Sequence, residues 1–294
     1  MPQGDSGVYL INSIEFRKPK LRLVYAAMVV GVIALALLCV VPILWVIISS
    51  LEPAREFYSV HPPIIPDRLN LSLLGQVWSS VGFLRLYANS GQVALGSVIS
   101  ALLFNSLLGY VLSRLRPRGT KLVFVVVLWT LMLPNTTAIV PVYENIIRFP
   151  LLHINLANTY FPLWLMAGAS AFNVIIFKSF FDSIPGELVE AAQIDGASYL
   201  RTFFNIILPL SKPVFLTITI FTVTGSWSDF FWPYLVLSQG TKQTVMVGLY
   251  GAANNLPANE LLLALTFGMV PPMVIFVFLQ RYIMQGFTLS GIRG

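Results

Sequence analysis

Long apolar stretches without charged side chains alternate with polar connecting segments along most of this chain. A helix needs about 20 mainly apolar residues to cross the hydrocarbon core of a bilayer. Six windows reach that length, and the fifth of them is the one that contains a charged residue, Asp229. The windows are 24–48, 87–113, 122–143, 156–177, 213–237 and 261–280. Because backbone groups in lipid must be hydrogen-bonded within their own segment, the pattern predicts an all-α, polytopic membrane protein with six transmembrane helices.

The composition favours a membrane protein over a soluble one. Of the 294 residues, 56% are hydrophobic and 10% are charged, whereas soluble domains average about 25% charged residues. The single cysteine, Cys39, lies inside the first window, so neither a disulfide framework nor a cysteine-based metal site is predicted. That window is longer than the apolar core of a cleavable signal peptide, about 7–15 residues, which indicates a retained first span.

The basic residues predict the orientation of the chain. If the N-terminus is placed inside, thirteen of the 18 lysine and arginine residues fall in inside segments and five fall in outside segments. The positive-inside rule then puts both termini in the cytoplasm. Residues 1–23 are predicted as a cytoplasmic N-terminal segment and residues 24–294 as the transmembrane domain. The net charge of +6 is explained by topology, and no nucleic-acid partner is predicted.

Two of the connecting segments are long. Residues 49–86 lie outside and are rich in proline, which predicts an extended external cap with little regular structure. Residues 178–212 lie inside and predict a helix pair that is interrupted at Gly196. Pro185 suits the first turn of the first helix, and the second helix is expected over 198–207, ended by Pro209 and Pro213.

The inside helix pair carries a spaced motif: E-A-A, three residues, G, nine residues, I, one residue, L-P. The matching residues are Glu190, Ala191, Ala192, Gly196, Ile206, Leu208 and Pro209. This motif resembles the cytoplasmic signature of ABC importer permeases. Asp195 and Ala197 complete a longer form, E-A-A-x-x-D-G-A, that is similar to the carbohydrate-uptake branch of type I importers. The small residues suit close approach by another surface.

The resemblance implies the type I ABC importer permease fold and a permease subunit that moves a sugar or oligosaccharide inward across the bacterial inner membrane. In such permeases the cytoplasmic coupling segment, here residues 182–209, docks on the ATPase. The implied coupling residues are Glu187, Glu190, Ala191, Ala192, Asp195, Gly196, Ala197, Ile206, Leu208 and Pro209. The implied partners are a second homologous permease, two ATP-binding subunits, an extracytoplasmic solute-binding protein, the sugar and the lipid bilayer. No cofactor or metal is implied.

Three further stretches are similar to this family. Pro141-Val142-Tyr143 leading to Asn158-Thr159-Tyr160 resembles its passage from the third span to the fourth, and Trp227 to Pro233 resembles its aromatic stretch in the fifth. The tail from Gln280 to Gly294 resembles the end of the smaller, maltose-type permease subunit, which reaches into the ATPase dimer.

Asp229 is the sharpest single-residue signal, because a carboxylate within a span is costly and usually faces a cavity or a partner. The candidate substrate pathway comprises Trp227, Asp229, Phe230, Phe231, Trp232 and Tyr234. The alternative is structural: Asp229 bonds a neighbouring helix and the aromatic residues form an interfacial belt. Likewise, Pro42, Pro134, Pro162, Pro271 and Pro272 either kink the spans or reflect the high frequency of proline in membrane helices.

Other functions fit the sequence less well. An intramembrane serine hydrolase could use Ser170, but both histidines, His61 and His153, lie in outside loops. A secondary carrier usually has several ionisable residues near the midplane and repeated halves. The sequence has no G-x-x-x-x-G-K-[ST] motif, so ATP hydrolysis is expected on a partner. A non-sugar solute, such as a glycerol-phosphate ester, is the alternative substrate for an importer permease.

Overall fold

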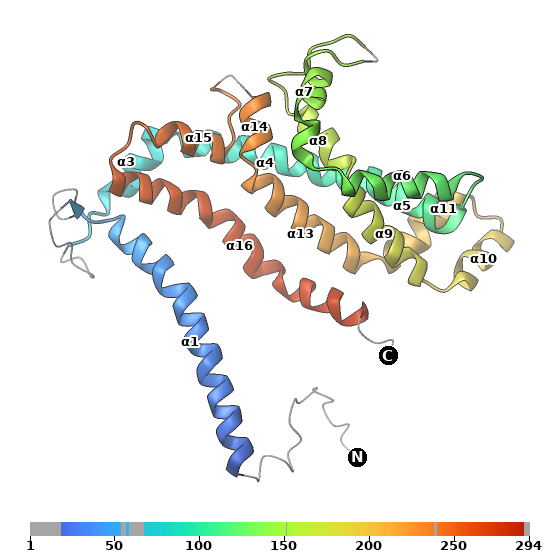
Figure 1. The fold of residues 1–294 in the computed structure, drawn as a ribbon, viewed down its shortest axis with the longest axis horizontal. Helices are drawn as coiled ribbons and strands as arrows, with labels where there is room; N and C mark the ends of the chain where they lie inside the picture. Colours follow the sequence, from blue (N-terminus) through green and yellow to red (C-terminus); the bar gives the residue numbers. More distant parts are fainter. Residues whose placement is uncertain (1–18, 54–56, 59–67, 151, 238–239, 291–294) are drawn as a thin grey trace. The chain divides into compact units, whose positions relative to one another are not determined.

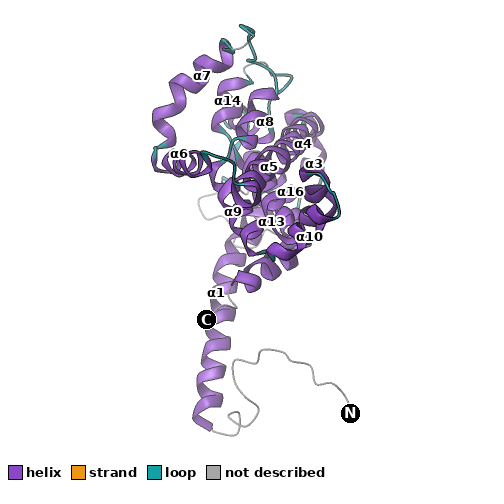
Figure 2. Cartoon of the chain, turned by 90° about the vertical axis from the view of Figure 1, so that its right-hand side faces the viewer, coloured by secondary structure: helices purple, strands orange, loops and turns teal. Residues whose placement is uncertain are grey.

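The computed structural model describes residues 19–53, 57–58, 68–150, 152–237 and 240–290, with residue 279 and residues 281–290 described by their backbone alone. Within these ranges the regular elements are helices and there is no strand (Figure 2). The predicted all-α fold class is confirmed. The chain divides into two compact units, Met1–Leu71 and Ser72–Gly294. Most of the N-terminal segment, most of the proline-rich part of the external loop and the last four residues of the tail lie outside the described residues.

Helix α1 (Pro19–Ser49) is the long element of the first unit. Its 31 residues contain Pro42 without interruption, and they rise about 46 Å at 1.5 Å per residue. This length exceeds the hydrocarbon thickness of a bilayer, about 30 Å, and it includes the whole first apolar window. After α1, the Asn70 amide donates to the Leu51 carbonyl at 2.8 Å, so the chain returns to the end of the helix.

The second unit contains the other helices (Figure 1). They are α3 (Ser72–Val81), α4 (Phe83–Ser100), η2 (Ala101–Asn105), α5 (Ser106–Tyr110), η3 (Val111–Leu115), α6 (Thr120–Met132), η4 (Asn135–Ala138), α7 (Ile139–Ile147), α8 (Phe161–Gly168), α9 (Ala171–Ser183), α10 (Gly186–Ile194), α11 (Tyr199–Thr202), η5 (Phe203–Ile207), α12 (Leu208–Leu210), α13 (Lys212–Ser228), α14 (Phe231–Val236), α15 (Val245–Ala252) and α16 (Ala258–Ser290). In Figure 1, α3 and α15 lie at one end of this unit and α10 and α11 at the other. Helix α13 packs against both α4 and α16.

Three described helices are each long and apolar enough to cross a membrane: Lys20–Ser49, Phe83–Leu115 and Ala258–Phe278. The second of these, from α4 through η3, is called the central rod below, and it includes two π-helical turns. Three bent helix pairs also qualify when each pair counts as one span. They are Thr120–Met132 with Thr136–Ile147, Phe161–Gly168 with Ala171–Ser183, and Tyr199–Leu210 with Lys212–Ser228. The described chain therefore offers up to six spans, in agreement with the predicted number.

The third window is bent by 99° rather than straight. The bend follows from Pro134, because a residue that precedes proline is pushed out of the helical region. Leu133 accordingly has an extended conformation, with φ −79° and ψ 129°. The other prolines behave differently: Pro271 and Pro272 lie inside α16, and Pro162 lies in the first turn of α8. Proline position therefore accounts for the bend at Pro134 and, with Pro209 and Pro213, marks the bend at Ser211, but the break between α8 and α9 contains no proline.

The expectation of little regular structure up to residue 86 is wrong for the part that is described. Helix α3 occupies residues 72–81, and α4 begins at Phe83, four residues before the predicted start of the second span. Leu73 and Val77 are four residues apart, so they share one face of α3, and both are buried. Helix α3 packs against α4, α15 and α16, which stabilises a helix that the external loop was not expected to contain.

Close packing of the central rod on α9 depends on a glycine. A Cβ atom added to Gly109 would lie 2.8 Å from Phe177 Cβ and 3.1 Å from the Lys178 amide nitrogen. We expect Gly109→Ala to lower the free energy of unfolding by about 1–3 kcal/mol, because such overpacking displaces backbone. Thermal melting of the purified chain in detergent measures this. Gly91→Ala is the matched control on the same rod, since its added Cβ meets nothing within 4 Å; equal melting of both variants would contradict the close contact.

Candidate functional site

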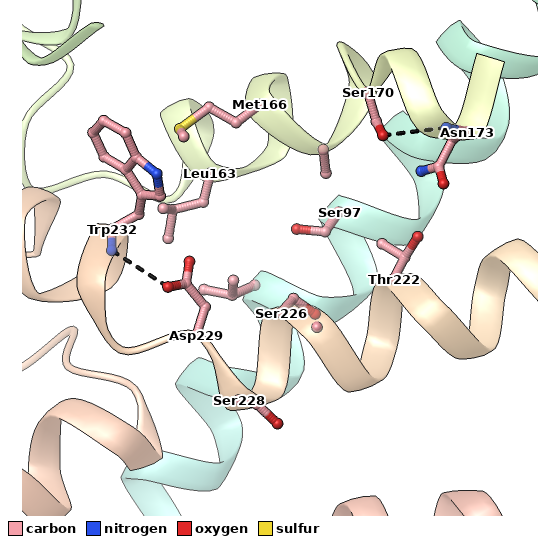
Figure 3. A pocket seen from close by; sticks show the side chains of 13 residues that line it. Ser97, Leu163, Met166, Ser170, Asn173, Thr222, Ser226, Ser228, Asp229 and Trp232 are labelled. Carbon is pink, nitrogen blue, oxygen red and sulfur yellow. Dashed lines mark hydrogen bonds between the residues drawn. The ribbon is translucent and has the colours of Figure 1, made fainter. Parts of the chain in front are cut away.

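A pocket of about 670 Å³ lies between α4, the α8–α9 pair and the α13–α14 pair (Figure 3). It is called the polar pocket below. Its lining residues are Val93, Ser97, Leu163, Met166, Ala167, Ser170, Asn173, Thr222, Gly225, Ser226, Ser228, Asp229 and Trp232. Eight of these carry a hydroxyl, amide, carboxylate or indole N–H group, and none is a lysine, arginine or histidine. A pocket of this size, with several polar groups on an apolar background, is typical of a site for a small solute.

The first wall of the polar pocket is the break between α8 and α9. Ser170 has an extended backbone with ψ 107°, and its Oγ accepts a hydrogen bond from the Asn173 amide at 3.3 Å. The buried Asn105 side chain, from the π-helical turn η2, bridges the same break. Its Nδ2 donates to the Ala167 carbonyl at 3.0 Å, and its Oδ1 accepts from the Ser170 amide at 3.1 Å. Asn105 therefore satisfies backbone groups that the break removes from the helical pattern.

The second wall is the break between α13 and α14. The predicted fifth span, 213–237, is not one continuous helix, because α13 ends at Ser228 and α14 begins at Phe231. Asp229 is extended, with ψ 122°, and its Oδ1 accepts a hydrogen bond from the Trp232 amide at 3.4 Å. In Figure 3 the Asp229 carboxylate points toward the side of the pocket where Leu163 and Trp232 lie. The carboxylate thus caps the new helix at the break and also faces the cavity.

Two of the six predicted pathway residues, Asp229 and Trp232, line the polar pocket. Trp227 is instead buried against α16, where its Nε1 donates to the Gly268 carbonyl at 3.1 Å. The Phe230 ring stacks on Tyr234, with centroids 5.1 Å apart, and both rings contact Tyr250. The Phe231 side chain is exposed. These four aromatic residues belong to contacts around the break rather than to the lining of the pocket.

Sequence reasoning missed most of the polar lining. Ser97, Thr222 and Ser226 are common residue types in membrane helices, so each by itself carries little information. Thr222 and Ser226 are four residues apart and therefore share one face of α13. The spacing of Ser170 and Asn173 is that of a helix N-cap and its third residue. These two spacings were the available signals for a polar face and for a helix break.

A second hydrogen-bond network fixes the chain beside the polar pocket. Asn89 Nδ2 donates to the carbonyls of Thr241 and Gln243 at 3.0 and 2.8 Å, and its Oδ1 accepts from the Tyr160 hydroxyl at 2.9 Å. Lys242 Nζ donates to the Asn158 carbonyl at 2.8 Å. These bonds join α4, the turn before α8 and the loop before α15. The stretch Asn158-Thr159-Tyr160 is therefore an anchor between segments that are far apart in the sequence.

The predicted coupling segment is an ordered helix pair, α10 followed by α11, η5 and α12. Gly196 has φ +79°, the left-handed conformation that favours glycine. The Ala197 amide donates to the Ala192 carbonyl at 2.9 Å, and the Gly196 amide donates to the Gln193 carbonyl at 3.0 Å. These two bonds form a Schellman motif that ends α10. Ser198 then caps α11 by accepting from the Arg201 amide at 3.3 Å.

Two details of this segment differ from the prediction. Pro185 precedes the first residue of α10 instead of lying within its first turn. Pro209 does not end the second helix, which continues to Leu210 and breaks at Ser211. Pro209 lies in the first turn of α12, just after the π-helical turn η5, where its missing amide hydrogen leaves no helical bond unmade. Pro213 lies in the first turn of α13, a position that suits it.

The coupling segment has a buried face and an exposed face. Among the predicted coupling residues, Ala192 is buried, whereas Ala197, Ile206 and Leu208 are half-buried. The exposed ones are Glu187, Glu190, Ala191, Asp195, Gly196 and Pro209. Several large apolar side chains are exposed beside them. These are Leu188, Ile194, Tyr199, Leu200 and Phe204, of which Ile194 is the most exposed, at 86%.

Comparisons with known proteins show what this chain is similar to. Residues 105–288 match the family model described as the binding-protein-dependent transport system inner membrane component. The arabinooligosaccharides transport system permease protein AraQ of Halalkalibacterium halodurans is 31% identical over 274 residues, which cover 90% of this chain and 95% of that protein. The sn-glycerol-3-phosphate transport system permease protein UgpE of Yersinia pestis is 29% identical over 248 residues, with coverages of 81% and 86%.

A solved structure is similar over nearly the whole chain. It is the crystal structure of a bacterial ABC transporter involved in the import of the acidic polysaccharide alginate. One of its chains matches with a TM-score of 0.77 and 23% sequence identity, covering 91% of this chain and 99% of that one. The type I permease fold implied by the sequence motif is thereby confirmed.

The role of Asn105 at the α8–α9 break can be tested directly. We expect Asn105→Leu to lower the free energy of unfolding, because each buried backbone group left without a partner costs about 1–3 kcal/mol. Thermal melting measures the loss, and hydrogen exchange of the Ser170 amide should become faster. Gln92→Leu, at an exposed position of the same rod, is the control. Unchanged protection of the Ser170 amide would contradict this role.

Proposed function

We propose that this chain, which belongs to the family of binding-protein-dependent transport system inner membrane components, is an ABC importer permease subunit that moves a neutral sugar or oligosaccharide inward. The observation that carries the proposal is the lining of the polar pocket. It has eight polar side chains, one of them the Asp229 carboxylate, and no cationic group. Breaks in two helices bring several of these groups to the cavity, as in other carriers whose discontinuous helices form the site.

The chemistry of this lining suits a sugar. Hydroxyl, amide and carboxylate oxygens accept hydrogen bonds from sugar hydroxyls, and the Asn173 and Trp232 side chains can donate. The indole ring of Trp232 adds an apolar surface with a polar edge. The volume of about 670 Å³ lies within the usual range for small-molecule sites, about 300–1,000 Å³. One relative is named for arabinooligosaccharides, which is consistent with this substrate class.

A glycerol-phosphate ester is the alternative solute, and one relative is named for such a substrate. Proteins bind phosphate with arginine, lysine or helix N-termini, because the dianion needs charge-assisted donors. Helix α9 begins at the polar pocket, but the lining has no arginine or lysine side chain, and the Asp229 carboxylate would repel an anion. The charge of the lining therefore favours a neutral solute for the part of the pathway that this chain forms.

The coupling segment supports an ATPase partner. The sequence contains no P-loop motif, so ATP is handled by two separate subunits. The exposed apolar residues Ile194, Leu200 and Phe204 lie in a segment whose Glu187, Glu190 and Asp195 are also exposed. Apolar anchors surrounded by polar groups are typical of a docking surface. The matching surface on the ATPase is expected to be an apolar cleft with a basic rim.

The mechanism is alternating access. The excess of basic residues in the inside segments predicts that both termini and the coupling segment lie in the cytoplasm. An extracytoplasmic binding protein delivers the solute to the outer face, where this chain and a second permease form the pathway. Closure of the ATPases moves the coupling segment and favours one conformation of the spans, because the subunits bind the two conformations with different affinities.

Reconstitution of the chain with its genomic partners tests the function. Proteoliposomes that contain both permeases and the ATPases are supplied with binding protein, ATP on the cytoplasmic side and a panel of labelled solutes. We expect ATP-dependent accumulation of a neutral sugar or oligosaccharide and no accumulation of sn-glycerol-3-phosphate. Accumulation of the phosphate ester alone, or of any solute without the ATPases, would contradict the proposal.

The docking role of the coupling segment predicts two variants with impaired assembly. Glu190→Lys reverses an exposed charge, and Gly196→Asp adds a second carboxylate beside Asp195 at an exposed position with φ +79°, a conformation that favours glycine. We expect both to reduce co-purification of the ATPase while membrane insertion is unchanged. Glu144→Lys, the same charge reversal on α7, is the control. Wild-type yields of ATPase with normal transport would refute this role.

The pocket role of Asp229 predicts a transport defect. Asp229→Asn keeps the size of the side chain but removes its charge, and hydrogen bonds to charged groups contribute about 1.5–3 kcal/mol. We therefore expect the transport kcat/KM to fall about 10–100-fold while the assembled complex still hydrolyses ATP. Glu144→Gln provides the control for loss of a carboxylate elsewhere. Normal uptake kinetics of Asp229→Asn would remove this residue from the pathway.

A further inference from the structure

The end of α9 is held by an unusual concentration of polar contacts just before the coupling segment begins. Asp182 Oδ1 accepts hydrogen bonds from Ser113 Oγ at 2.7 Å and from Arg116 Nη2 at 3.2 Å. Its Oδ2 accepts from Lys178 Nζ at 2.6 Å. Ser113, Arg116, Lys178 and Asp182 are called the Asp182 cluster below. The cluster bonds the last turn of the central rod to α9. Asp182 lies three residues before Pro185, the residue that precedes α10.

Arg114 strengthens the same junction from the other side. Its Nη2 donates to the carbonyls of Phe181 and Ile184. The last carbonyls of a helix have no partner within the helix, and a cation there also complements the helix dipole. Lys178 in addition lies over the ring of Phe124 on α6, with 4.9 Å between Nζ and the ring centroid. Three helices therefore meet at this point.

The coupling segment packs on the same junction. Phe203 and Ile207 of η5 and Val189 of α10 belong to one buried cluster with Tyr110 of the rod and Phe181 of α9. The Tyr110 hydroxyl also donates to the Tyr199 carbonyl of α11 at 3.3 Å. The apolar cluster excludes water and packs the coupling segment against the rod. The Asp182 cluster adds directional hydrogen bonds between the end of the rod and α9.

The three hydrogen bonds to Asp182 contribute unequally to stability, because their donors differ in exposure to solvent. The side chain of Arg116 is 66% exposed, and an ion pair so open to solvent contributes little. Ser113 is buried, at 1% exposure, and the Lys178 side chain is 21% exposed, so their bonds to Asp182 are better shielded. Asp182 is the shared acceptor of all three bonds. Its removal would leave Ser113 and Lys178 without this partner at the same time.

We propose that Asp182 is a positioning residue that makes the coupling segment, α9 and the central rod move as one rigid body. The rod carries Ser97 and α9 carries Asn173, both in the lining of the polar pocket. A displacement of α10 by the ATPase therefore reaches two walls of the pocket together. This inference rests on the proposed transport function and adds the element that connects ATP hydrolysis to the site.

The test compares solute transported per ATP hydrolysed in the reconstituted full complex with Asp182→Asn, Ser113→Ala and Asp182→Glu. We expect Asp182→Asn to keep ATPase co-purification and to hydrolyse ATP, but to lower this ratio at least about fivefold, the size of a typical coupling effect. Ser113→Ala should lower the ratio less. Asp182→Glu, which retains the charge, should restore most of it. Glu144→Gln is the control and should leave the ratio unchanged.

Each outcome has one meaning. A wild-type ratio for Asp182→Asn overturns this inference and leaves the transport function intact. If both Asp182→Asn and Ser113→Ala fail to assemble with the ATPases, the cluster is needed for folding, and the inference is also overturned. If the wild-type complex imports no solute with ATP, the transport function itself fails, and the inference falls with it.

Discussion

A peptide group at membrane depth must find its hydrogen-bond partner inside the protein, because lipid offers none. This constraint explains the most informative feature of the structure, which is that its helices break beside the polar pocket. At the α8–α9 break the Asn105 side chain takes the place of the missing backbone partners. At the α13–α14 break the Asp229 carboxylate does the same for the Trp232 amide. Polar side chains thus allow the breaks, and the breaks in turn place polar groups in the cavity.

The rest of the second unit supports these breaks by close packing. The central rod approaches α9 at Gly109 and α8 at Gly96, where an added Cβ would overlap the Trp164 ring. Such contacts leave little room for independent movement, since packed interiors shift between discrete arrangements rather than deform continuously. Polar anchors at both ends complete the frame: Asn89 holds one end of the rod to the loop before α15, and Asp182 is bonded to Ser113 at the other. A stiff frame around a cavity suits a protein that alternates between two states.

The sequence was sufficient for the fold class, the number of candidate spans and the turn at Gly196, because each depends on local rules of hydropathy or backbone geometry. It was insufficient where tertiary contacts decide. Helix α3 forms because Leu73 and Val77 are buried by distant helices, which no local pattern reveals. The bend at Pro134 has a local cause, whereas the break at Ser170 depends on Asn105, 65 residues earlier in the chain. For the same reason Asp229 stood out as a lone charge, while the serines and Thr222 around it did not.

The distribution of charge gives the clearest link between the two functional regions. Basic side chains gather near the coupling segment, where Arg114, Arg116 and Lys178 contact the end of α9. The polar pocket has one carboxylate and no cation. An anion that entered the pocket would lose hydration without gaining a lysine or arginine side chain as a partner, whereas a neutral polyhydroxyl solute would exchange water for hydroxyl and amide groups at little cost. Under the proposed function, the pocket without cationic side chains receives the solute, and the basic side chains hold the segment that is proposed to dock on the ATPases.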